Sequence, residues 1–395
     1  MEKWRTEKLE KIKNIELIMG QSPPSSSFNE NSEGLPFLQG NADFGSIYPT
    51  ISKYTTNPIK IALEDDILLS VRAPVGDINL APFKLCIGRG LAAIRIKENS
   101  NIFYFYWFQK IKNILENLGI GSTFKAITKN ELKRLAIPIP PLSEQQKIAE
   151  ILRTVDEAIQ KVDETIEKTK RLKQGLMNEL LTKGIGHKEF KDSEIGRIPK
   201  EWRVIKLDDL SLNLIGGGTP STSNPAFWDG TIPWMTSAYI NRRLVTKGQR
   251  NITEEGLKNS ATNLIPKENL LITTRVGIGK VAINVIDMAI SQDLTGIIVD
   301  KTKSTPDFLY WFFISIENKL KGLAQGSTIK GILREELGRL KVTLPSLSEQ
   351  QKIAEILTTV DLKIEIEEKR RERLERIKKG LMEELLTGKK RVSVG

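Results

Sequence analysis

The 395-residue sequence predicts two related α/β (α+β) domains separated by two long antiparallel coiled-coil helices. Three observations support this fold class: a ten-residue segment that occurs twice, an apolar seam of helical period behind each copy, and short apolar runs bounded by turn residues before each copy. The segment Ser-Glu-Gln-Gln-Lys-Ile-Ala-Glu-Ile-Leu begins at Ser143 and again at Ser348, an offset of 205 residues. A repeat of this length is too long for a solenoid and indicates two whole domains.

Each copy of the repeated segment is predicted to begin a long helix. Ser143 and Gln146 form a capping-box pattern, which Ser348 and Gln351 repeat. The first seam has apolar residues three and four positions apart, at Ile148, Leu152, Val155, Ile159, Val162 and Ile166. The second has Ile353, Leu357, Val360 and Ile364 in the same phase. No proline interrupts residues 143–182, which would make a helix roughly 60 Å long.

An exposed apolar seam on a long helix needs a partner. For one Lys/Glu-rich helix, a solvated face with an ordinary core stripe would be the simpler interpretation. Two matching copies favour pairing with each other instead. If an approximate twofold axis relates the repeats and crosses the pair, the helices run antiparallel, with one globular domain at each end.

Length and composition indicate a globular chain with ordinary cores, because 39% of the residues are hydrophobic. No apolar run has the length of a membrane span and the first residues lack the apolar core of a signal peptide, so we expect a cytoplasmic protein. Cys86 is the only cysteine, which excludes a disulfide framework, and we expect a buried thiol. His187 lies in a glycine-containing linker and is expected to be an exposed loop residue.

The net charge of +11 and the pI near 9.4 favour a polyanionic partner such as a phosphate backbone. Charge alone supports this hypothesis only modestly, since many basic proteins bind no nucleic acid. The sequence of the domains supplies the more specific argument.

The first domain shows short strands that end in polar loops. Apolar runs at residues 36–41, 67–72 and 91–96 are predicted strands, and the turn-rich loop at residues 20–27 precedes them. Six consecutive aromatic residues at 103–108 begin a predicted helix that extends to Leu118. Core packing is favoured over base stacking for these aromatics, because consecutive aromatic side chains on a helix mostly point inward.

The second domain repeats this skeleton after a linker at residues 184–200. Trp202-Arg203 corresponds to Trp4-Arg5, residues 271–275 correspond to 68–72, and Tyr310-Trp311-Phe312 is aligned with Tyr106-Trp107-Phe108. The loop residues differ: Gln39-Gly40-Asn41 corresponds to Thr236-Ser237-Ala238, and Gly88-Arg89-Gly90 to Ser291-Gln292-Asp293. Shared scaffolds with different loops indicate two related sites that recognise different things.

Taken together, these motifs resemble the specificity subunit of type I restriction–modification enzymes. The resemblance rests on the two SEQQKIAEIL segments after a Pro-rich strand, the GLMxELLT helix ends, the Gly-Gln-Ser-Pro and Gly-Gly-Thr-Pro loops, and Ser-Gln-Asp-Leu-Thr-Gly at 291–296. It implies a target-recognition domain at 1–142, a spacer helix at 143–183, a linker at 184–200, a second target-recognition domain at 201–347, a second spacer helix at 348–388 and a tail at 389–395.

The resemblance also implies partners. Each recognition domain would read one half of a split double-stranded DNA target, and the helices would set the spacing and bind methyltransferase (modification) subunits, two per chain. Restriction/translocase subunits would join through the complex. Nothing ahead of Trp4 matches residues 191–200, so the first domain is expected to begin abruptly.

Residue patterns for catalysis are missing. The sequence has no Asn/Asp-Pro-Pro-aromatic element for methyl transfer and no phosphate loop, because Gly279-Lys280 continues into Val281. Asp307, Glu317 and Lys319 resemble a nuclease metal site, but no predicted strand carries them and the first repeat lacks the acids. We expect no metal, no cofactor and no enzyme activity. A self-contained metal-dependent nuclease and a coiled-coil scaffold without DNA binding are the alternatives.

Base edges are read by Arg on guanine, by Asn or Gln on adenine and more loosely by Ser or Thr. For any single loop residue, a structural hydrogen bond is at least as good an interpretation as a base contact. Lys125 and Lys330, in the repeated Gly-Ser-Thr-x-Lys segments, suit phosphate better than bases. The other candidate DNA-binding residues are Gln21, Ser22, Gln39, Asn41, Arg72 and Arg89 in the first domain and Thr219, Thr236, Ser237, Tyr239, Arg242, Arg243, Arg275 and Gln292 in the second.

Overall fold

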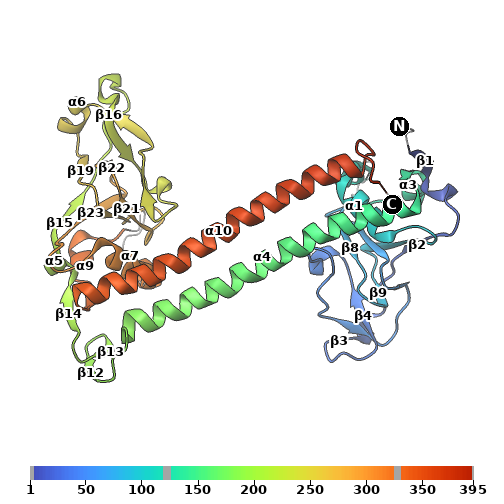
Figure 1. Cartoon of the computed structure of the whole chain (residues 1–395), viewed down its shortest axis with the longest axis horizontal. Helices are drawn as coiled ribbons and strands as arrows, with labels where there is room; N and C mark the ends of the chain where they lie inside the picture. Colours follow the sequence, from blue (N-terminus) through green and yellow to red (C-terminus); the bar gives the residue numbers. More distant parts are fainter. Residues whose placement is uncertain (1–3, 119–125, 324–330, 394–395) are drawn as a thin grey trace. The chain divides into compact units, whose positions relative to one another are not determined.

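The computed structural model describes residues 4–118, 126–323 and 331–393 (Figure 1). The chain forms two compact units: Met1–Glu164 with Glu368–Gly395, and Thr165–Glu367. Each unit combines one globular domain with part of both long helices, α4 (Leu142–Lys183) and α10 (Leu347–Leu385). No helix in the described ranges is long and apolar enough to cross a membrane.

The first domain contains two main sheets and a small ribbon. The ribbon pairs β1 (Arg5–Lys8) with β11 (Ala136–Ile139). The four-stranded antiparallel sheet has the order β2 (Ile15–Met19), β10 (Leu91–Ile96), β7 (Ile67–Ser70), β8 (Ile78–Leu80). The second sheet has the order β3 (Phe28–Asn29), β5 (Tyr54–Thr55), β4 (Leu35–Leu38), β9 (Leu85–Ile87), β6 (Ile61–Ala62).

The second domain repeats this plan, again with one five-stranded and one four-stranded main sheet. β14 (Arg203–Lys206) pairs with β24 (Lys341–Leu344), as β1 pairs with β11. One sheet has the order β15 (Ser211–Gly216), β23 (Leu294–Val299), β20 (Asn269–Thr273), β21 (Val281–Asn284), β17 (Leu244–Val245). The other has the order β18 (Arg250–Ile252), β16 (Trp228–Met235), β22 (Met288–Ile290), β19 (Asn263–Ile265). The linker is not a loop throughout, because β12 (Phe190–Ser193) and β13 (Gly196–Pro199) form a hairpin.

An aromatic helix fills the core of each domain. α1 (Asn101–Lys110) and α7 (Pro306–Ser315) begin 205 residues apart. Residues 103–108 and 308–313 are all buried, which confirms core packing over base stacking. Because the helices keep the 205-residue offset, Tyr106 corresponds to Trp311, and the alignment of Tyr106 with Tyr310 was wrong by one residue. Ile111 separates α1 from α2 (Lys112–Leu118).

The remaining short helices lie around these cores. They are α3 (Lys129–Arg134) in the first unit and α5 (Leu207–Leu210), α6 (Glu254–Lys258), α8 (Glu317–Gly322) and α9 (Arg334–Gly338) in the second. Short 3-10 turns are η1 (Leu9–Lys11), η2 (Ser25–Ser27), η3 (Asn41–Asp43), η5 (Pro225–Phe227) and η6 (Ser237–Tyr239). Cys86 is a free, fully buried thiol, as expected.

The capping box predicted at Ser143 is wrong. α4 begins at Leu142, so Ser143 lies inside the first turn, and the N–H groups of Glu144 and Gln145 both donate to the Pro141 carbonyl. The prolines and Leu142 start the helix, which leaves the glutamate and glutamine of the motif free to bind the domain. In the second copy, Ser346 ahead of α10 accepts from the Glu349 N–H at 3.3 Å.

The glutamine of each motif ties the long helix to the aromatic helix. Gln145 Oε1 accepts from the Ser100 N–H at 3.0 Å, and its Nε2 donates to the Pro140 carbonyl at 2.9 Å. Gln350 makes the same bonds, accepting from the Thr305 N–H at 3.0 Å and donating to the Pro345 carbonyl at 3.1 Å. Both glutamines are fully buried. Each therefore fixes the first turn of α4 or α10 against the start of α1 or α7.

The glutamate of each motif holds a tryptophan and a segment that follows a long helix. Glu144 accepts from Trp4 Nε1 at 3.1 Å and from Arg391 Nε at 2.7 Å. Glu349 accepts from Trp202 Nε1 at 3.0 Å and from His187 Nε2 at 2.8 Å. The expectation of an exposed His187 was therefore wrong: this side chain is 13% exposed and closes the linker onto Glu349.

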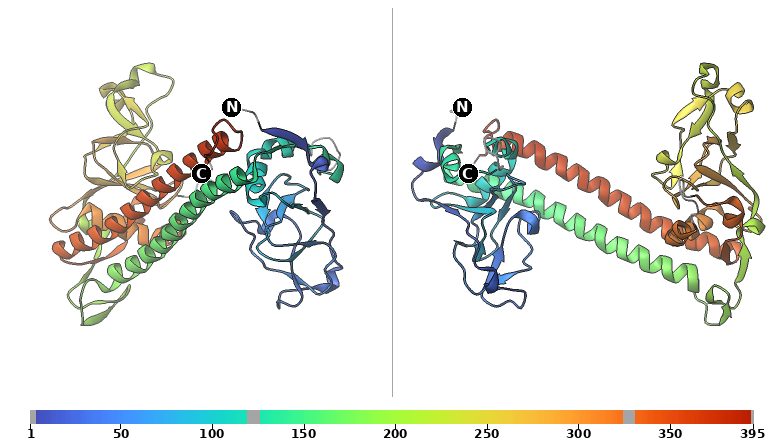
Figure 2. Two further views of the ribbon diagram at one scale, coloured as in Figure 1. Left: turned by 45° about the vertical axis from the view of Figure 1, so that its right-hand side comes forward. Right: turned by 180° about the vertical axis from the view of Figure 1, so that it is seen from behind.

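Within each unit the two long helices run antiparallel (Figure 2). In the first unit, Asp156 pairs with Lys378 at 2.7 Å and Asp163 with Arg371 at 2.5 Å, so positions rise along α4 as they fall along α10. In the second unit, Lys173 pairs with Asp361. Most of the predicted seam is buried, at Ile148, Leu152, Val162, Ile166, Ile353, Leu357 and Ile364, whereas Val155, Ile159 and Val360 are half-buried.

Candidate DNA interface

Four loops of the first domain meet along one edge of its sheets. The Gly20 N–H donates to the Leu91 carbonyl, the Gln21 N–H to Ile87, the Gly88 N–H to Leu38 and the Gly90 N–H to Gln39. The Val71 N–H donates to the Gly90 carbonyl, which adds the loop after β7. These bonds connect the loops after β2, β4, β7 and β9 into one continuous edge, which we call the first loop edge.

Candidate reading residues gather on the first loop edge. The Gln39 side-chain amide donates to Ser22 Oγ at 2.9 Å, and the Arg89 N–H donates to the same oxygen at 3.3 Å. The side chains of Gln21, Gln39 and Arg89 are exposed. Gly88 and Gly90 are required here, because a Cβ on either would lie within 3.0 Å of Gln39 atoms. The edge thus carries an exposed glutamine and an exposed arginine on adjoining loops.

The second domain builds the same edge with different side chains. The Gly218 N–H donates to the Ile290 carbonyl, the Ser291 N–H to Met235 and the Thr274 N–H to Asp293. We call this the second loop edge. Thr219 Oγ1 donates to Gln292 Oε1 at 2.6 Å. Ser22 and Thr219 occupy equivalent loops, whereas the glutamine comes from the loop after β4 in one domain and from the loop after β22 in the other.

The sequence did not reveal Gln249 as a member of the second loop edge. Thr236 Oγ1 donates to Gln249 Oε1 at 2.8 Å, and the Gln249 N–H donates to the Trp234 carbonyl. Only the antiparallel pairing of β16 with β18 places this residue beside Thr236. The neighbouring Arg250 lies over the Trp228 ring, 4.0 Å from its centroid, so its guanidinium is held by the domain.

Hairpin loops present Arg72 and Arg275 at equivalent places. The fully buried Ser70 hydroxyl donates to the Pro74 carbonyl at 2.9 Å, and the fully buried Thr273 hydroxyl donates to Gly277 at 2.6 Å. Both arginines are exposed. The carbonyl of the preceding residue accepts from the Ile127 N–H in one domain and from the Ile332 N–H in the other. The loops are therefore anchored on both sides of the arginine.

Three candidate DNA-binding residues are either bonded to another side chain of the protein or buried. Asn41 donates to Asp77 at 2.5 Å, Arg243 donates to Asp307 at 2.5 Å, and Ser237 is 4% exposed. Their observed contacts are structural. Tyr239 and Arg242 are exposed on the segment that follows β16, while Lys125 and Lys330 lie outside the described residues.

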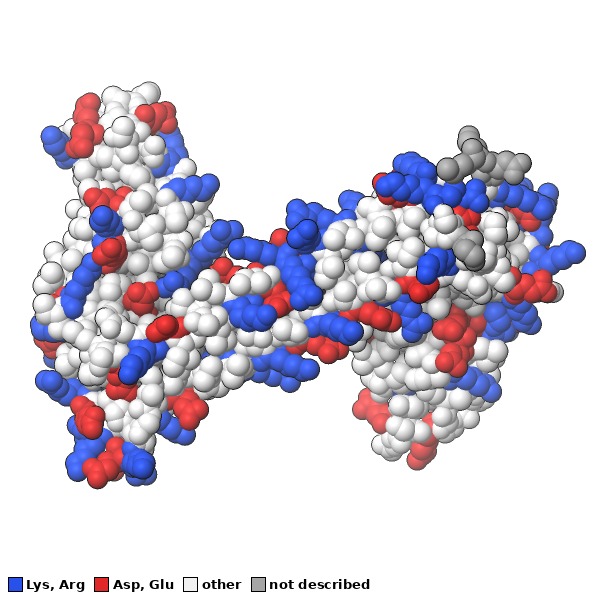
Figure 3. Space-filling view, viewed as in Figure 1, with Lys and Arg blue, Asp and Glu red and all other residues white. Residues whose placement is uncertain are grey.

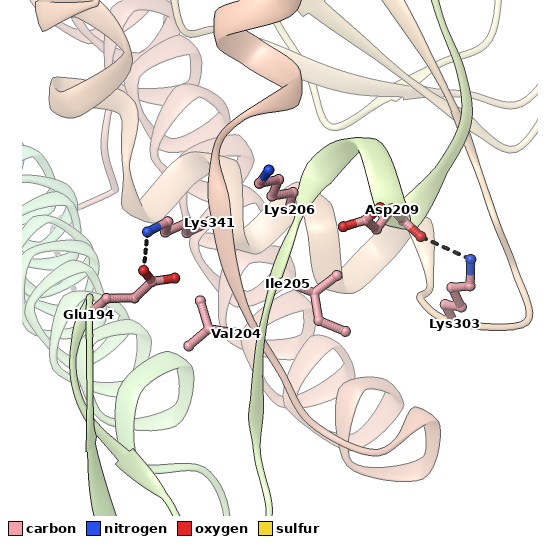
Figure 4. A pocket seen from close by; sticks show the side chains of 7 residues that line it. All are labelled: Glu194, Val204, Ile205, Lys206, Asp209, Lys303 and Lys341. Carbon is pink, nitrogen blue, oxygen red and sulfur yellow. Dashed lines mark hydrogen bonds and ion pairs between the residues drawn. The ribbon is translucent and has the colours of Figure 1, made fainter.

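Basic side chains also lie away from the loop edges. In Figure 3 basic side chains gather along α10, where Lys369, Arg370, Arg373, Arg376 and Lys379 are exposed. The second unit has an open cavity of about 510 Å³. Figure 4 shows the side chains that line it, among them Lys206, Lys303, Lys341, Glu194 and Asp209. Lys341 pairs with Glu194, and Lys303 with Asp300 at 3.0 Å. The charges of this cavity largely cancel, so it does not fit a polyanion.

The nuclease-like residues do not converge on a metal site. Asp307 is the second residue of α7 and pairs with Arg243, while Glu317 begins α8 and pairs with Lys321 at 2.7 Å. Within the described ranges, no three His, Cys, Asp or Glu side chains are placed to hold a metal ion. The acids are used in surface ion pairs.

Two related domains present equivalent loop edges with different polar side chains. This arrangement defines a protein with two recognition domains of different specificity. The profile of the type I restriction modification DNA specificity domain matches residues 1–171 and 199–376. The chain belongs to this family. A family of specificity subunits supplies recognition within a complex, so the nuclease alternative loses its support.

Relatives are named as specificity subunits. The putative MjaX subunit of Methanocaldococcus jannaschii is 51% identical over 183 residues, which are 46% of this chain but only 43% of that protein. The MjaVIII subunit of the same organism is 29% identical over 96% of this chain and 91% of its own length. The EcoR124I/EcoR124II subunit of Escherichia coli is 30% identical over 60% of this chain and 57% of that one.

The fold also matches a solved structure over its whole length. The S subunit of the type I restriction–modification system from M. genitalium has a TM-score of 0.64 at 16% identity, with 99% of this chain and 97% of that chain covered. This likeness supports the architecture of two domains and two long helices.

Proposed function

We propose that this chain is the non-catalytic DNA-recognition subunit of a type I restriction–modification complex. Each domain reads one half of a bipartite double-stranded target through its loop edge. The long helices set the spacing and dock two methyltransferase subunits, through which restriction/translocase subunits join. The proposal includes a cytoplasmic location, because the target DNA lies in the cytoplasm.

One observation carries the proposal: the loop edge occurs twice on the same backbone with different reading groups. Gln39 and Arg89 occupy the positions that Thr236 and Gln292 occupy in the second domain. Amide and guanidinium side chains make the bidentate contacts that distinguish adenine and guanine. A shared function that needed one ligand would keep the same side chains on both edges.

A loop exchange tests the proposal. Residues 220–251, which include Thr236 and Gln249, are replaced by those of a relative, and the methylated sequences of cells that express the complex are mapped. One half of the target should change while the other half and the spacer stay the same. A simultaneous change of both halves contradicts independent reading by the two domains.

The long helices expose apolar side chains that suit protein docking. In the second unit, Leu172 of α4 is 54% exposed, and Leu362 and Ile366 of α10 are 49% and 59% exposed. Leu362 and Ile366 are four residues apart and share one helix face. We assign this face to a methyltransferase subunit. Leu362→Glu with Ile366→Glu should abolish co-purification of that subunit, while Leu212→Glu, at an exposed leucine of β15, is the matched control.

The scaffold alternative makes a different prediction. A coiled-coil scaffold without a DNA role retains its partner regardless of salt and retains no duplex DNA. DNA retention that falls steeply with salt favours the recognition subunit, because phosphate contacts release counterions.

A further inference from the structure

An exposed apolar residue, Val276, lies at the tip of the loop that carries Arg275. Val276 is 60% exposed, whereas the flanking Thr274 is 4% exposed and Ile278 packs against the core. Single exposed apolar residues are common on protein surfaces. Val276 differs because it stands beside Arg275 on the second loop edge, where the reading groups gather.

The tip is held rigidly from both ends. Thr273 Oγ1 donates to the Gly277 carbonyl at 2.6 Å and accepts from the Lys280 N–H at 2.9 Å. On the other side, the Thr274 N–H donates to Asp293 and its carbonyl accepts from Ile332. A valine side chain has one strongly restricted rotatable bond, so little entropy remains to be lost when it makes a contact. The two methyl groups of Val276 are presented in a fixed place.

The chemistry of the surface limits what such a group can contact. In the major groove of DNA the exposed apolar group of the base pairs is the 5-methyl of thymine, and small apolar side chains recognise it. An arginine next to the valine suits a neighbouring guanine. We propose that Val276 is a specificity-determining residue that contacts the methyl group of a thymine in the half-site read by the second domain. This inference rests on the proposed function.

The first domain supplies an internal comparison. Its equivalent tip is Arg72-Ala73-Pro74, pinned by Ser70 in the same way. The side chain of Ala73 has one carbon where that of Val276 has three, so it is shorter at the equivalent position. The inference therefore predicts a larger thymine-methyl contact from this loop in the second half-site than from the equivalent loop in the first.

Deoxyuridine substitution tests the contact directly, since deoxyuridine is thymidine without the 5-methyl group. The target is first selected from a randomised duplex library with the full chain, and each thymine is then replaced singly by deoxyuridine. One position in the second half-site should lose about fourfold in affinity, the effect of withdrawing one methyl group from an apolar contact. Val276→Ala should bind the thymine duplex more weakly and should no longer distinguish the two duplexes.

The controls separate this inference from the proposed function. Ala73→Gly, in the first domain, should leave the deoxyuridine effect in the second half-site unchanged. The inference is overturned if the second half-site contains no thymine, if no position is sensitive, or if Val276→Ala keeps the sensitivity. Equal weakening of all duplexes by Val276→Ala also overturns it, because it would indicate a general wedge or backbone contact. Binding that does not distinguish target from random duplex would instead contradict the proposed function.

Discussion

Lys378 of α10 donates to Asp156 of α4 at 2.7 Å while its Nζ lies 5.4 Å from the centroid of the Tyr106 ring. The second unit contains the same arrangement by the 205-residue offset: Lys173 pairs with Asp361 and lies 5.2 Å from the Trp311 centroid. In each unit one lysine thus joins both long helices and the aromatic helix. The carboxylate next to the ring contributes to raising the pKa of Tyr106, after burial of the phenol itself.

We expect Lys378→Ala to destabilise the first unit by about 2–3 kcal/mol, because Asp156 is buried and would lose its charged partner. Urea unfolding of the full chain, followed by hydrogen exchange of α1 and α4, measures this loss. Arg371→Ala is the matched control. Its pair with Asp163 has both side chains more than 40% exposed, so a cost below about 1 kcal/mol is expected. If the two variants lose the same free energy of unfolding, the buried pair of Lys378 with Asp156 is no more important than the exposed pair of Arg371 with Asp163.

Acid should release the tail from Glu144. Burial alone would raise the pKa of this carboxyl, but Arg391, the Val392 N–H and Trp4 outweigh burial and lower the pKa below its ordinary value of 4.5. A lowered folded-state pKa gives stability that is present above the unfolded value and is lost as the pH falls through the folded value. The protection factor of the Val392 amide against hydrogen exchange, taken relative to the intrinsic exchange rate at each pH, should therefore fall below about pH 4.5.

Glu144→Gln supplies the comparison for the tail contact. This variant should show fast exchange at Val392 already at neutral pH and a flatter acid dependence, with a cost of about 1–3 kcal/mol for the lost charge-assisted bonds. If the variant and the parent show the same acid dependence, a group other than Glu144 controls the release of the tail.

The sequence predicted the parts of this protein that depend on local pattern. The helical seam followed from the spacing of Ile148 and Leu152, and the burial of the aromatic helix followed from six consecutive aromatics. The predicted capping box is wrong because the helix begins at Leu142, two residues earlier than a cap at Ser143 would place its start, so Ser143 lies inside the first turn. His187 and Gln249 could not be placed, because their partners Glu349 and Thr236 are brought to them only by tertiary pairing.

Arginine and lysine variants should separate base reading from phosphate binding. Arg275→Ala should relax the preference at one position of the second half-site by about 1–3 kcal/mol, because its fixed loop suits a bidentate contact with guanine. Lys330→Ala should weaken binding to all sequences and flatten the salt dependence. Titrations of target and random duplexes at several salt concentrations measure both effects. If Arg275→Ala lowers the affinity for both duplexes equally, this arginine contacts a phosphate and does not read a base.

The long helices should act as a ruler for the gap between the half-sites. α4 and α10 each continue from one compact unit into the other, so residues added at the boundary extend the connection without disturbing contacts inside either unit. Four residues after Glu164 and four after Glu367 keep the antiparallel pairs Asp156–Lys378 and Lys173–Asp361 within their own units. An insertion in α4 alone, for example after Gly175, would shift one helix against the other and is the mismatched control.

Each added residue lengthens a helix by 1.5 Å, so four residues add roughly 6 Å, a little under two base pairs. Four residues also rotate the helix by only about 40° beyond one full turn, so the seam is nearly preserved. The doubly extended chain should therefore prefer a spacer one or two base pairs longer with both half-sites unaltered, as read by methylation mapping. An unchanged spacer in a folded, DNA-binding variant would show that bound subunits or bending of the DNA fix the distance instead of the helices.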